Sequence, residues 1–431
     1  MNPASNKLAF FRQSSWMIAA TTAGGLFMYA VHVPALARLP EDEYAVFATL
    51  LQAINLMLIP GLSLQIVFAQ QAAGARTEGE KRRLTGAVRA LLAAIVAVWV
   101  ALALAALLFQ NGALTALKIT NPAALWVTVA AFLPTLSLYL MQGLLQGTQN
   151  FLWLGWVGIL NGLGRFLFVL VAVVWLGGHA AGAMAGPLMG MVAALALAMW
   201  QTGENWSGPF EPFEWRPWLA RVVPLTLGLA ASQIMLAADM IIVRAHFQSE
   251  TGLYAAAGTI ARGLVIFTGP VAMVMFPKIV RSLSSAERLG LLGQALLGTG
   301  TLASLAALAC TFLPELPFRI LKPAYLPIAP LLPWFAWAMM PLTLTNVLIN
   351  DLLARSRYRA VPWLLAVALA YIVALSLVAK PASAGESLSG FKLVVQTIGA
   401  FNLLLLGVAG WFAWRTQAGK LPWPRAHAHD S

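Results

Sequence analysis

Three charged side chains lie deep inside apolar stretches of this 431-residue sequence: Arg165, Asp239 and Arg262. A charge at the centre of a lipid bilayer costs roughly 2.5 to 3.5 kcal/mol, so such a residue usually marks a transport pathway or an ion pair. A carboxylate and a guanidinium can neutralise each other, and a guanidinium can also bind phosphate through two parallel hydrogen bonds. These residue types therefore indicate internal ion pairing, binding of an anionic ligand, or both.

Asp239 and Arg262 flank a short polar turn, so their two helices must be antiparallel neighbours. At 1.5 Å per residue, Asp239 lies roughly 10 to 12 Å from the turn end of its helix and Arg262 roughly 15 Å from the turn end of the next. The nearly equal depths allow two arrangements. The charges form a buried ion pair that fixes the helical hairpin, or they line a water-filled cavity.

Arg165 shares a helix face with Asn161, Gly158 and Gly162, and no acidic residue lies nearby in the sequence at the same depth. Two intramembrane arginines and one aspartate leave the interior with a net positive charge, which suits an anionic passenger. The alternative is a structural hydrogen bond from the guanidinium to backbone carbonyls. Arg165 and Asn161 are therefore candidate cavity residues.

Uncharged polar residues form softer stripes on three further predicted helices. Tyr29 and His32 share one face with Thr22 and Gly25, and Gln52 and Asn55 share a face with Ser63; the third stripe contains Thr343, Asn346 and Asn350. Hydroxyl and amide groups can exchange hydrogen bonds with sugar hydroxyls, but they also hold membrane helices together. His32 is either a titrating group in a coupling step or a histidine satisfied at a helix interface.

The composition identifies the solvent of these helices. The chain is 60% hydrophobic and 10% charged, with a mean hydropathy of +0.79, which is too apolar for a soluble protein. Twelve apolar segments are long enough to span a bilayer, centred near residues 27, 58, 101, 134, 165, 190, 235, 265, 300, 340, 370 and 402. The runs are continuous rather than alternating, so they predict an all-α bundle and exclude a β-barrel. We expect the first helix to be retained and not cleaved as a signal peptide.

The positions of lysine and arginine predict the orientation. With the N-terminus inside, eighteen of the 27 basic residues fall on the cytoplasmic side, seven on the opposite side and two within spans. Both termini are therefore expected in the cytoplasm of a multi-pass protein. The net charge of +12 reflects this bias and attraction to anionic lipids, so nucleic acid is not an expected partner. The single Cys310 offers neither a disulfide nor a metal site.

A polar connection divides the predicted spans into six and six. We expect an N-terminal lobe at residues 1–200, a cytoplasmic linker at 201–219 and a C-terminal lobe at 220–431. The two halves show a weak repeat: residues 42–48 align with residues 249–255, and Pro60 corresponds to Pro270. Internal repeats are common in transporters, whose substrate sites lie between the repeats near the middle of the membrane.

Several motifs resemble those of one known family. Residues 224–282 contain LAASQIMLAADMIIV, SETGLYAAA and MFPKIVR, and the start of the chain contains LAFFRQSSW, LPEDEYAVF and IPGL. These motifs resemble polysaccharide-exporting flippases of the multidrug/oligosaccharidyl-lipid/polysaccharide (MOP) superfamily. The resemblance implies two six-helix lobes in a V, a cavity lined mainly by helices 1, 2, 7 and 8, and alternating access.

What the resemblance implies about function is a flippase of the bacterial cytoplasmic membrane. It would move a lipid-linked, polyprenyl-pyrophosphate oligosaccharide to the outer leaflet for surface polysaccharide synthesis, without a bound cofactor and with a proton or sodium gradient as a candidate driving force. Partners would be membrane lipids and the polymerase and glycosyltransferases of the pathway. Two alternatives stay open: a cation-coupled multidrug exporter, favoured only by Asp239, and a membrane glycosyltransferase or polymerase using Glu41-Asp42-Glu43. The acidic triplet also fits a helix N-terminus.

Overall fold

The computed structural model describes residues 3–247, 250–263, 285–354, 357–383 and 387–417, and this part of the chain is helical throughout with no strand. Ten of its helical segments are long and apolar enough to cross a membrane. The predicted all-α membrane fold is thus confirmed. The segment predicted near residue 265 lies largely outside the described residues, as do Pro270 and residues 275–281 of the family motif.

The helices follow the predicted spans closely. The first half contains α1 (Pro3–Ala30), α2 (His32–Arg38), α3 (Glu41–Leu56), α4 (Leu58–Gly74), α5 (Glu78–Leu108), α6 (Gln110–Ala116), α7 (Pro122–Gly147), α8 (Phe151–Leu170), a π-helical turn (Val171–Trp175), α9 (His179–Gln201) and α10 (Gly203–Ser207). The second half contains α11 (Trp215–His246), a helical stretch at 251–263, α13 (Ser285–Phe312), α14 (Leu316–Leu321), η2 (Pro323–Leu331), α15 (Leu332–Ala354), η3 (Tyr358–Ala360), α16 (Val361–Ala382) and α17 (Ser387–Gln417).

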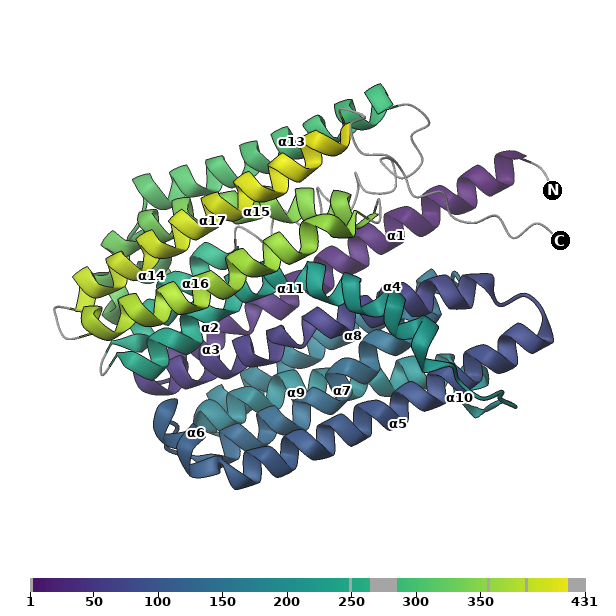
Figure 1. The fold of residues 1–431 in the computed structure, drawn as a ribbon. Coiled ribbons are helices and arrows are strands. Elements are labelled where there is room, and N and C mark those ends of the chain that lie inside the picture. Colours follow the sequence, from purple (N-terminus) through teal and green to yellow (C-terminus); the bar gives the residue numbers. More distant parts are fainter. Residues whose placement is uncertain (1–2, 248–249, 264–284, 355–356, 384–386, 418–431) are drawn as a thin grey trace.

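The helices run between two ends of the molecule (Figure 1). We call the end where α1 begins and α17 ends the terminal end; it includes residues 75–77, 148–150 and 202–214. The opposite, far end includes residues 39–40, 117–121 and 313–315. In the first half, α8 packs along α1 and α9, and α7 packs along α4 and α9; in the second half, α15 packs along α13 and α17, and α16 along α11 and α17.

Proline breaks the second predicted span where the sequence places it. The helix is interrupted at Met57, between α3 and α4, three residues before Pro60. Because Pro60 has no backbone N–H, it cannot bond the carbonyl four residues earlier, which is that of Leu56. The sequence-based expectation that Pro60 interrupts this helix is therefore confirmed.

Two buried apolar clusters divide the interior. One crosses the far end, where Phe47 of α3 and Met184 of α9 join Met235 of α11 and Phe335 of α15. The other lies toward the terminal end, within α4, α5 and α7–α9, and also contains the start of α11. The two halves of the chain thus share one continuous core at the far end.

Helix α11 takes part in both clusters. Trp218 and Val222, in its first turns, pack in the terminal-end cluster with α4 and α5, whereas Ala231 and Met235 pack in the far-end cluster. Pro224 stands between the two groups inside the helix. The first turns of α11 are therefore packed against the first half of the chain, although they follow the predicted linker.

The linker before α11 is bound to α5. Arg89 donates from Nε to the carbonyl of Trp206 at 2.8 Å and from Nη2 to the carbonyls of Ser207 and Gly208 at 2.9 and 3.0 Å. The backbone N–H of Glu211 donates to the Arg82 carbonyl at 3.1 Å. This connection is a structured part of the terminal end.

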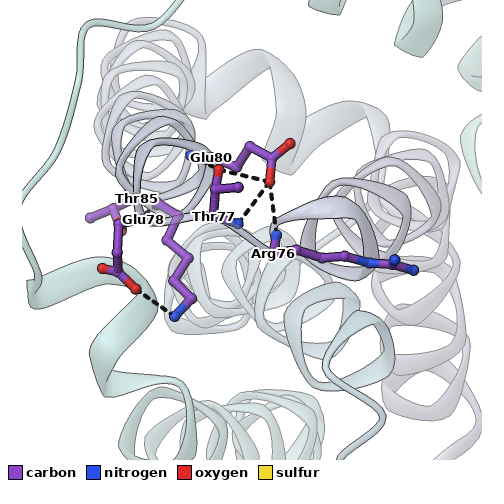
Figure 2. Close-up of polar contacts among 6 residues, drawn as sticks. Arg76, Thr77, Glu78, Glu80 and Thr85 are labelled. Atoms are coloured by element: carbon purple, nitrogen blue, oxygen red, sulfur yellow. Dashed lines mark hydrogen bonds and ion pairs between the residues drawn. The ribbon is translucent and has the colours of Figure 1, made fainter.

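A capping box begins α5 (Figure 2). The Thr77 hydroxyl accepts from the Glu80 N–H at 3.3 Å, and Glu80 Oε2 accepts from the N–H groups of Thr77 and Arg76 at 2.8 and 2.9 Å. Reciprocal bonds of this kind satisfy backbone donors that have no partner within the helix. The box fixes the start of α5 beside the linker.

Candidate functional site

Asp239 and Arg262 form a buried ion pair, joining Asp239 Oδ2 to Arg262 Nη2. Asp239 is 0% exposed and Arg262 5% exposed. Tyr254 donates its hydroxyl to Asp239 Oδ2 at 2.7 Å, and Arg262 Nε donates to the Leu236 carbonyl at 3.1 Å. The guanidinium also lies over the Phe335 ring, 5.6 Å from its centroid. The pairing alternative of the sequence analysis thus describes this geometry.

Tyr29 and His32 belong to a polar aromatic cluster that joins the two halves of the chain. Tyr29 donates to the carbonyl of Thr259 at 2.8 Å, and Tyr44 donates to the Thr259 hydroxyl at 3.0 Å. His32 Nδ1 lies 3.3 Å from the Tyr44 hydroxyl, and its ring contacts those of Tyr29 and Phe47 with centroids 5.7 Å apart. His32 is therefore satisfied at a helix interface, as one of the two predicted alternatives requires.

The ion pair and the aromatic cluster are neighbours. Thr259 and Arg262 are one turn apart in the same helical stretch, and the charge of Arg262 interacts electrostatically with Tyr29, His32 and Tyr44. Four of the eight predicted site residues are thus brought together between α1–α3 and the hairpin that contains α11.

Arg165 and Asn161 form a separate pair on α8. Arg165 Nε donates to Asn161 Oδ1 at 3.1 Å, and the two residues are 9% and 5% exposed. A Cβ atom on Gly190 of α9 would lie 2.7 Å from Arg165 Cγ, so glycine makes room for the arginine stem. Among the described residues, no ion pair includes Arg165. Its charge is buried without a carboxylate.

The remaining predicted residues are paired with each other on α3. Asn55 Nδ2 donates to Gln52 Oε1 at 3.1 Å, and Gln52 is 8% exposed.

The glycines beside Arg165 serve helix packing: a Cβ on Gly162 would lie 2.2 Å from the carbonyl oxygen of Gly24 in α1. The small residues of that face therefore allow α1 and α8 to approach closely.

A set of far-end contacts was not predicted. Arg244, at the end of α11, is 2% exposed and donates to the carbonyls of Leu117 and Lys118, both at 2.9 Å. It also donates to the Thr251 hydroxyl at 2.7 Å and lies 3.5 Å from Asp42 Oδ1. The sequence showed only that Arg244 is a basic residue in the last turn of a helix, where it is favourable. Its carbonyl partners could not be predicted because they lie in another part of the chain.

Two lysines complete these contacts. Lys118 Nζ donates to the carbonyl of Phe247, and Lys322 Nζ donates to the carbonyl of Leu39 at 2.5 Å. Partial burial lowers the pKa of both ammonium groups below the usual lysine value. We call Asp42, Lys118, Arg244 and Lys322 the far-end clasp, because each residue bonds the other half of the chain.

The acidic triplet Glu41-Asp42-Glu43 occupies the first turn of α3. Asp42 faces Arg244, and Glu43 Oε2 accepts from the Ala180 N–H at the start of α9 at 2.7 Å. A Cβ on Gly252 would lie 2.3 Å from the Glu41 carbonyl oxygen. These carboxylates hold far-end elements together, as expected for the helix N-terminus alternative.

A family model described as "Polysaccharide biosynthesis protein" matches residues 10–283. The matched region covers more than half of the chain. The chain belongs to this family. Among curated protein sequences, none matches the chain significantly.

Solved structures show the same fold. An inward-facing multidrug resistance MATE transporter of the MOP superfamily matches with a TM-score of 0.69 and 13% identity, covering 92% of this chain and 94% of that one. An outward-facing MATE transporter of the same superfamily matches with a TM-score of 0.66 and 15% identity, covering 96% of each chain. The lipid II flippase MurJ, in an inward closed conformation, matches with a TM-score of 0.68 and 14% identity, covering 90% and 86%.

These matches confirm the predicted MOP fold and superfamily. The chain is a multi-pass membrane protein with the architecture of the transporters and the flippase named above. The fold therefore gives no support to the glycosyltransferase alternative, and the acidic triplet on which that alternative depended has a structural role.

Proposed function

We propose that this family member is a flippase that moves a lipid-linked oligosaccharide from the cytoplasmic to the outer leaflet. The observation that carries the proposal is the buried guanidinium of Arg165, which has no carboxylate partner among the described residues. A buried charge without a counter-charge is costly, so it is usually retained for a ligand of opposite sign. The pyrophosphate of a polyprenyl-linked sugar supplies that sign.

The guanidinium of Arg165 is suited to binding such an anion. Asn161 accepts a bond from Nε and thereby fixes the plane of the group. The two Nη atoms make no hydrogen bond within the described part of the chain, so the remaining donors of the fork are left for a ligand. Phosphate oxygens match this fork in a bidentate manner. Asn161 would act as the positioning residue and Arg165 as the phosphate ligand.

The far-end clasp supports an alternating-access cycle for this flippase. It bonds the two halves of the chain at the end opposite the termini. With both termini in the cytoplasm, as the basic residues predict, the closed end would face outward and a cavity between the halves would open inward. Substrate would enter from the cytoplasmic leaflet, and opening of the clasp would release it outside.

The cation-exporting alternative needs an available carboxylate. Asp239 already accepts from Arg262 and Tyr254 and is fully buried, so it does not offer an open negative charge to a cationic drug. The geometry therefore favours the anionic, lipid-linked substrate.

Complementation of surface polysaccharide in a flippase-deficient strain tests the proposal. Arg165→Ala should abolish export while leaving membrane abundance nearly unchanged, since no ion pair is broken. Arg165→Lys should restore it only in part, because an ammonium lacks the planar fork. Arg319→Ala, which changes an exposed arginine on α14, is the matched control. Normal polysaccharide export by abundant Arg165→Ala protein would refute the flippase assignment. So would a wild-type protein that confers drug resistance but does not restore polysaccharide export.

A further inference from the structure

A cavity of about 800 Å³ lies at the terminal end, and none of the candidate site residues described above lines it. Its walls come from the end of α4, the start of α5, the linker and the first turns of α11; they include Gln71, Glu80, Glu211 and Trp218. The linker wall is fixed to α5 through Arg89 and the Arg83–Glu211 ion pair at 2.9 Å. The cavity is therefore part of the folded structure and not a gap beside a loose loop.

Two buried polar atoms in this wall have no hydrogen-bond partner within the described part of the chain: Trp218 Nε1, a donor, and Gln71 Oε1, an acceptor. Trp218 is 6% exposed. A buried polar atom without a hydrogen-bond partner destabilises the fold. Both residues line the same cavity, so one occupant that offers an acceptor and a donor would satisfy both atoms once the two side chains turn toward it.

The charge of the wall specifies the occupant further. Arg83 neutralises Glu211, which leaves the carboxylates of Glu80 and Glu214 as net negative charge. Figure 2 shows that the Glu80 oxygen bonded to Thr77 and Arg76 faces them, while the second oxygen points away. The wall thus attracts a cationic donor beside an apolar, aromatic surface.

Phe213 and Trp218 form that aromatic surface of the cavity, and Trp215 packs edge-on against both rings; the ring centroids are 4.8 to 6.0 Å apart. Indole rings favour the membrane–water interface, and an ammonium group is attracted to their faces. The carboxylates and the aromatic wall of the cavity therefore suit a cation. The indole N–H suits an acceptor oxygen.

We propose that this cavity binds a zwitterionic group with a primary ammonium and a phosphate, such as the head group of phosphatidylethanolamine. The ammonium donates to Gln71 Oε1 and to the carboxylates of Glu80 and Glu214. The phosphate accepts from Trp218 Nε1 and lies near Arg83. The site is independent of the proposed transport function, because it uses none of the residues assigned to that substrate.

The test uses the full chain in nanodiscs of phosphatidylcholine and phosphatidylglycerol with and without phosphatidylethanolamine. Native mass spectrometry of the released protein measures which lipid is retained. We expect phosphatidylethanolamine to be enriched about fivefold over phosphatidylcholine, the ratio that one hydrogen bond of ordinary net strength provides. Phosphatidylcholine has the same phosphate but no N–H donor, so the comparison isolates the ammonium.

Two variants separate the contributions. Glu214→Gln removes an exposed carboxylate that faces the ammonium, so it should bring the ratio of phosphatidylethanolamine to phosphatidylcholine close to that of the bulk bilayer. Trp218→Phe removes the donor to the phosphate, which both lipids share, and keeps an aromatic ring, so it should lower the retained amount of both lipids without changing their ratio. Glu204→Gln, on α10 and outside the cavity, should keep the wild-type ratio. Equal retention of both lipids by the wild type, enrichment unchanged in Glu214→Gln, or lipid retention undiminished in Trp218→Phe would overturn the proposal.

A second arm identifies the source of the group. Soluble phosphoethanolamine is added to the protein in detergent, and the midpoint of thermal unfolding is measured. A rise that Trp218→Phe abolishes shows that the free head group suffices. Enrichment of the lipid without such a rise assigns the site to the intact phospholipid, and both outcomes support the zwitterionic chemistry.

Discussion

At the scale of single residues, the ion pair of Asp239 and Arg262 predicts that single variants are less stable than the double variant. Removal of one partner leaves an uncompensated buried charge, which destabilises a protein by about 3–5 kcal/mol. We expect Asp239→Ala and Arg262→Ala each to lower the amount of folded protein in the membrane. The double variant should recover much of it. Quantitative blotting of membranes, with thermal unfolding of purified protein, measures the effect.

Tyr254→Phe provides a graded control for this pair. It removes the hydroxyl that donates to Asp239 at 2.7 Å but leaves the Arg262 contact and the ring packing intact. Its expected destabilisation is about 1.5–3 kcal/mol, the usual range for a hydrogen bond to a charged group. If the double variant were no more abundant than either single variant, the pair would not be the main structural role of these residues.

The sequence predicted the two partners of this pair but not their surroundings. Equal depths on two antiparallel helices are enough to match Asp239 with Arg262. Tyr44 and Thr259 lie more than two hundred residues apart, and nothing in their local sequence indicates that they bond each other. Arg165 was recognised as a buried charge on the same helix face as Asn161, but the hydrogen bond between their side chains was not predicted.

At the scale of helices, the far-end closure depends on a glycine. A Cβ on Gly252 would lie 2.3 Å from the Glu41 carbonyl oxygen, so the helical stretch at 251–263 could not keep its distance from α3. Gly252→Ala should therefore destabilise the closed far end by about 1–3 kcal/mol, as overpacking does. Gly112→Ala, in α6, has no atom within 4 Å of the added Cβ and is the control.

Thiol labelling measures this opening directly. In a Cys310→Ser background, a cysteine in place of Leu39, which is 2% exposed, reports access to the far end. We expect faster labelling when Gly252→Ala is added and no change with Gly112→Ala. Identical labelling rates in the two would show that the glycine does not control closure.

Helical spans were easier to predict than the contacts between them. Continuous apolar runs identify a spanning helix without tertiary information, and Pro60 located the break between α3 and α4. The short helices α2, α6 and α14 escaped prediction because their boundaries depend on far-end packing. The bonds from Arg244 to Leu117 and Lys118 are likewise set by tertiary structure, because the acceptors are backbone carbonyls, which every residue has.

At the scale of the whole molecule, orientation is a testable property. The excess of basic residues on the terminal-end loops predicts that this end is cytoplasmic. Reporter fusions after residues 80, 210 and 357 should therefore read cytoplasmic, and fusions after residues 120 and 314 should read external. A reversed pattern would place the closed far end in the cytoplasm and contradict the direction of transport proposed above.

The last expectation concerns how the two halves of the chain are joined. A cut between Pro209 and Phe210 leaves Arg89 and its three carbonyl partners in the first fragment. The second fragment begins just before Glu211 and Trp218, which dock on the first half through the Arg82 carbonyl and the terminal-end cluster. Coexpressed fragments should therefore associate and support export.

Gly86 tests whether that docking holds the fragments together. A Cβ at Gly86 would lie 1.9 Å from the Glu211 carbonyl oxygen, whereas at Gly79, on the same helix, the nearest atom would be 4.0 Å away. Displacing the contact costs about 1–3 kcal/mol, so Gly86→Ala should weaken association of the fragments by roughly tenfold and Gly79→Ala should not. The uncut chain should tolerate Gly86→Ala better, because the covalent connection keeps the docking segment at a high effective concentration. Copurification of tagged fragments measures the difference, and equal recovery with both alanine variants would show that the far-end contacts alone join the halves.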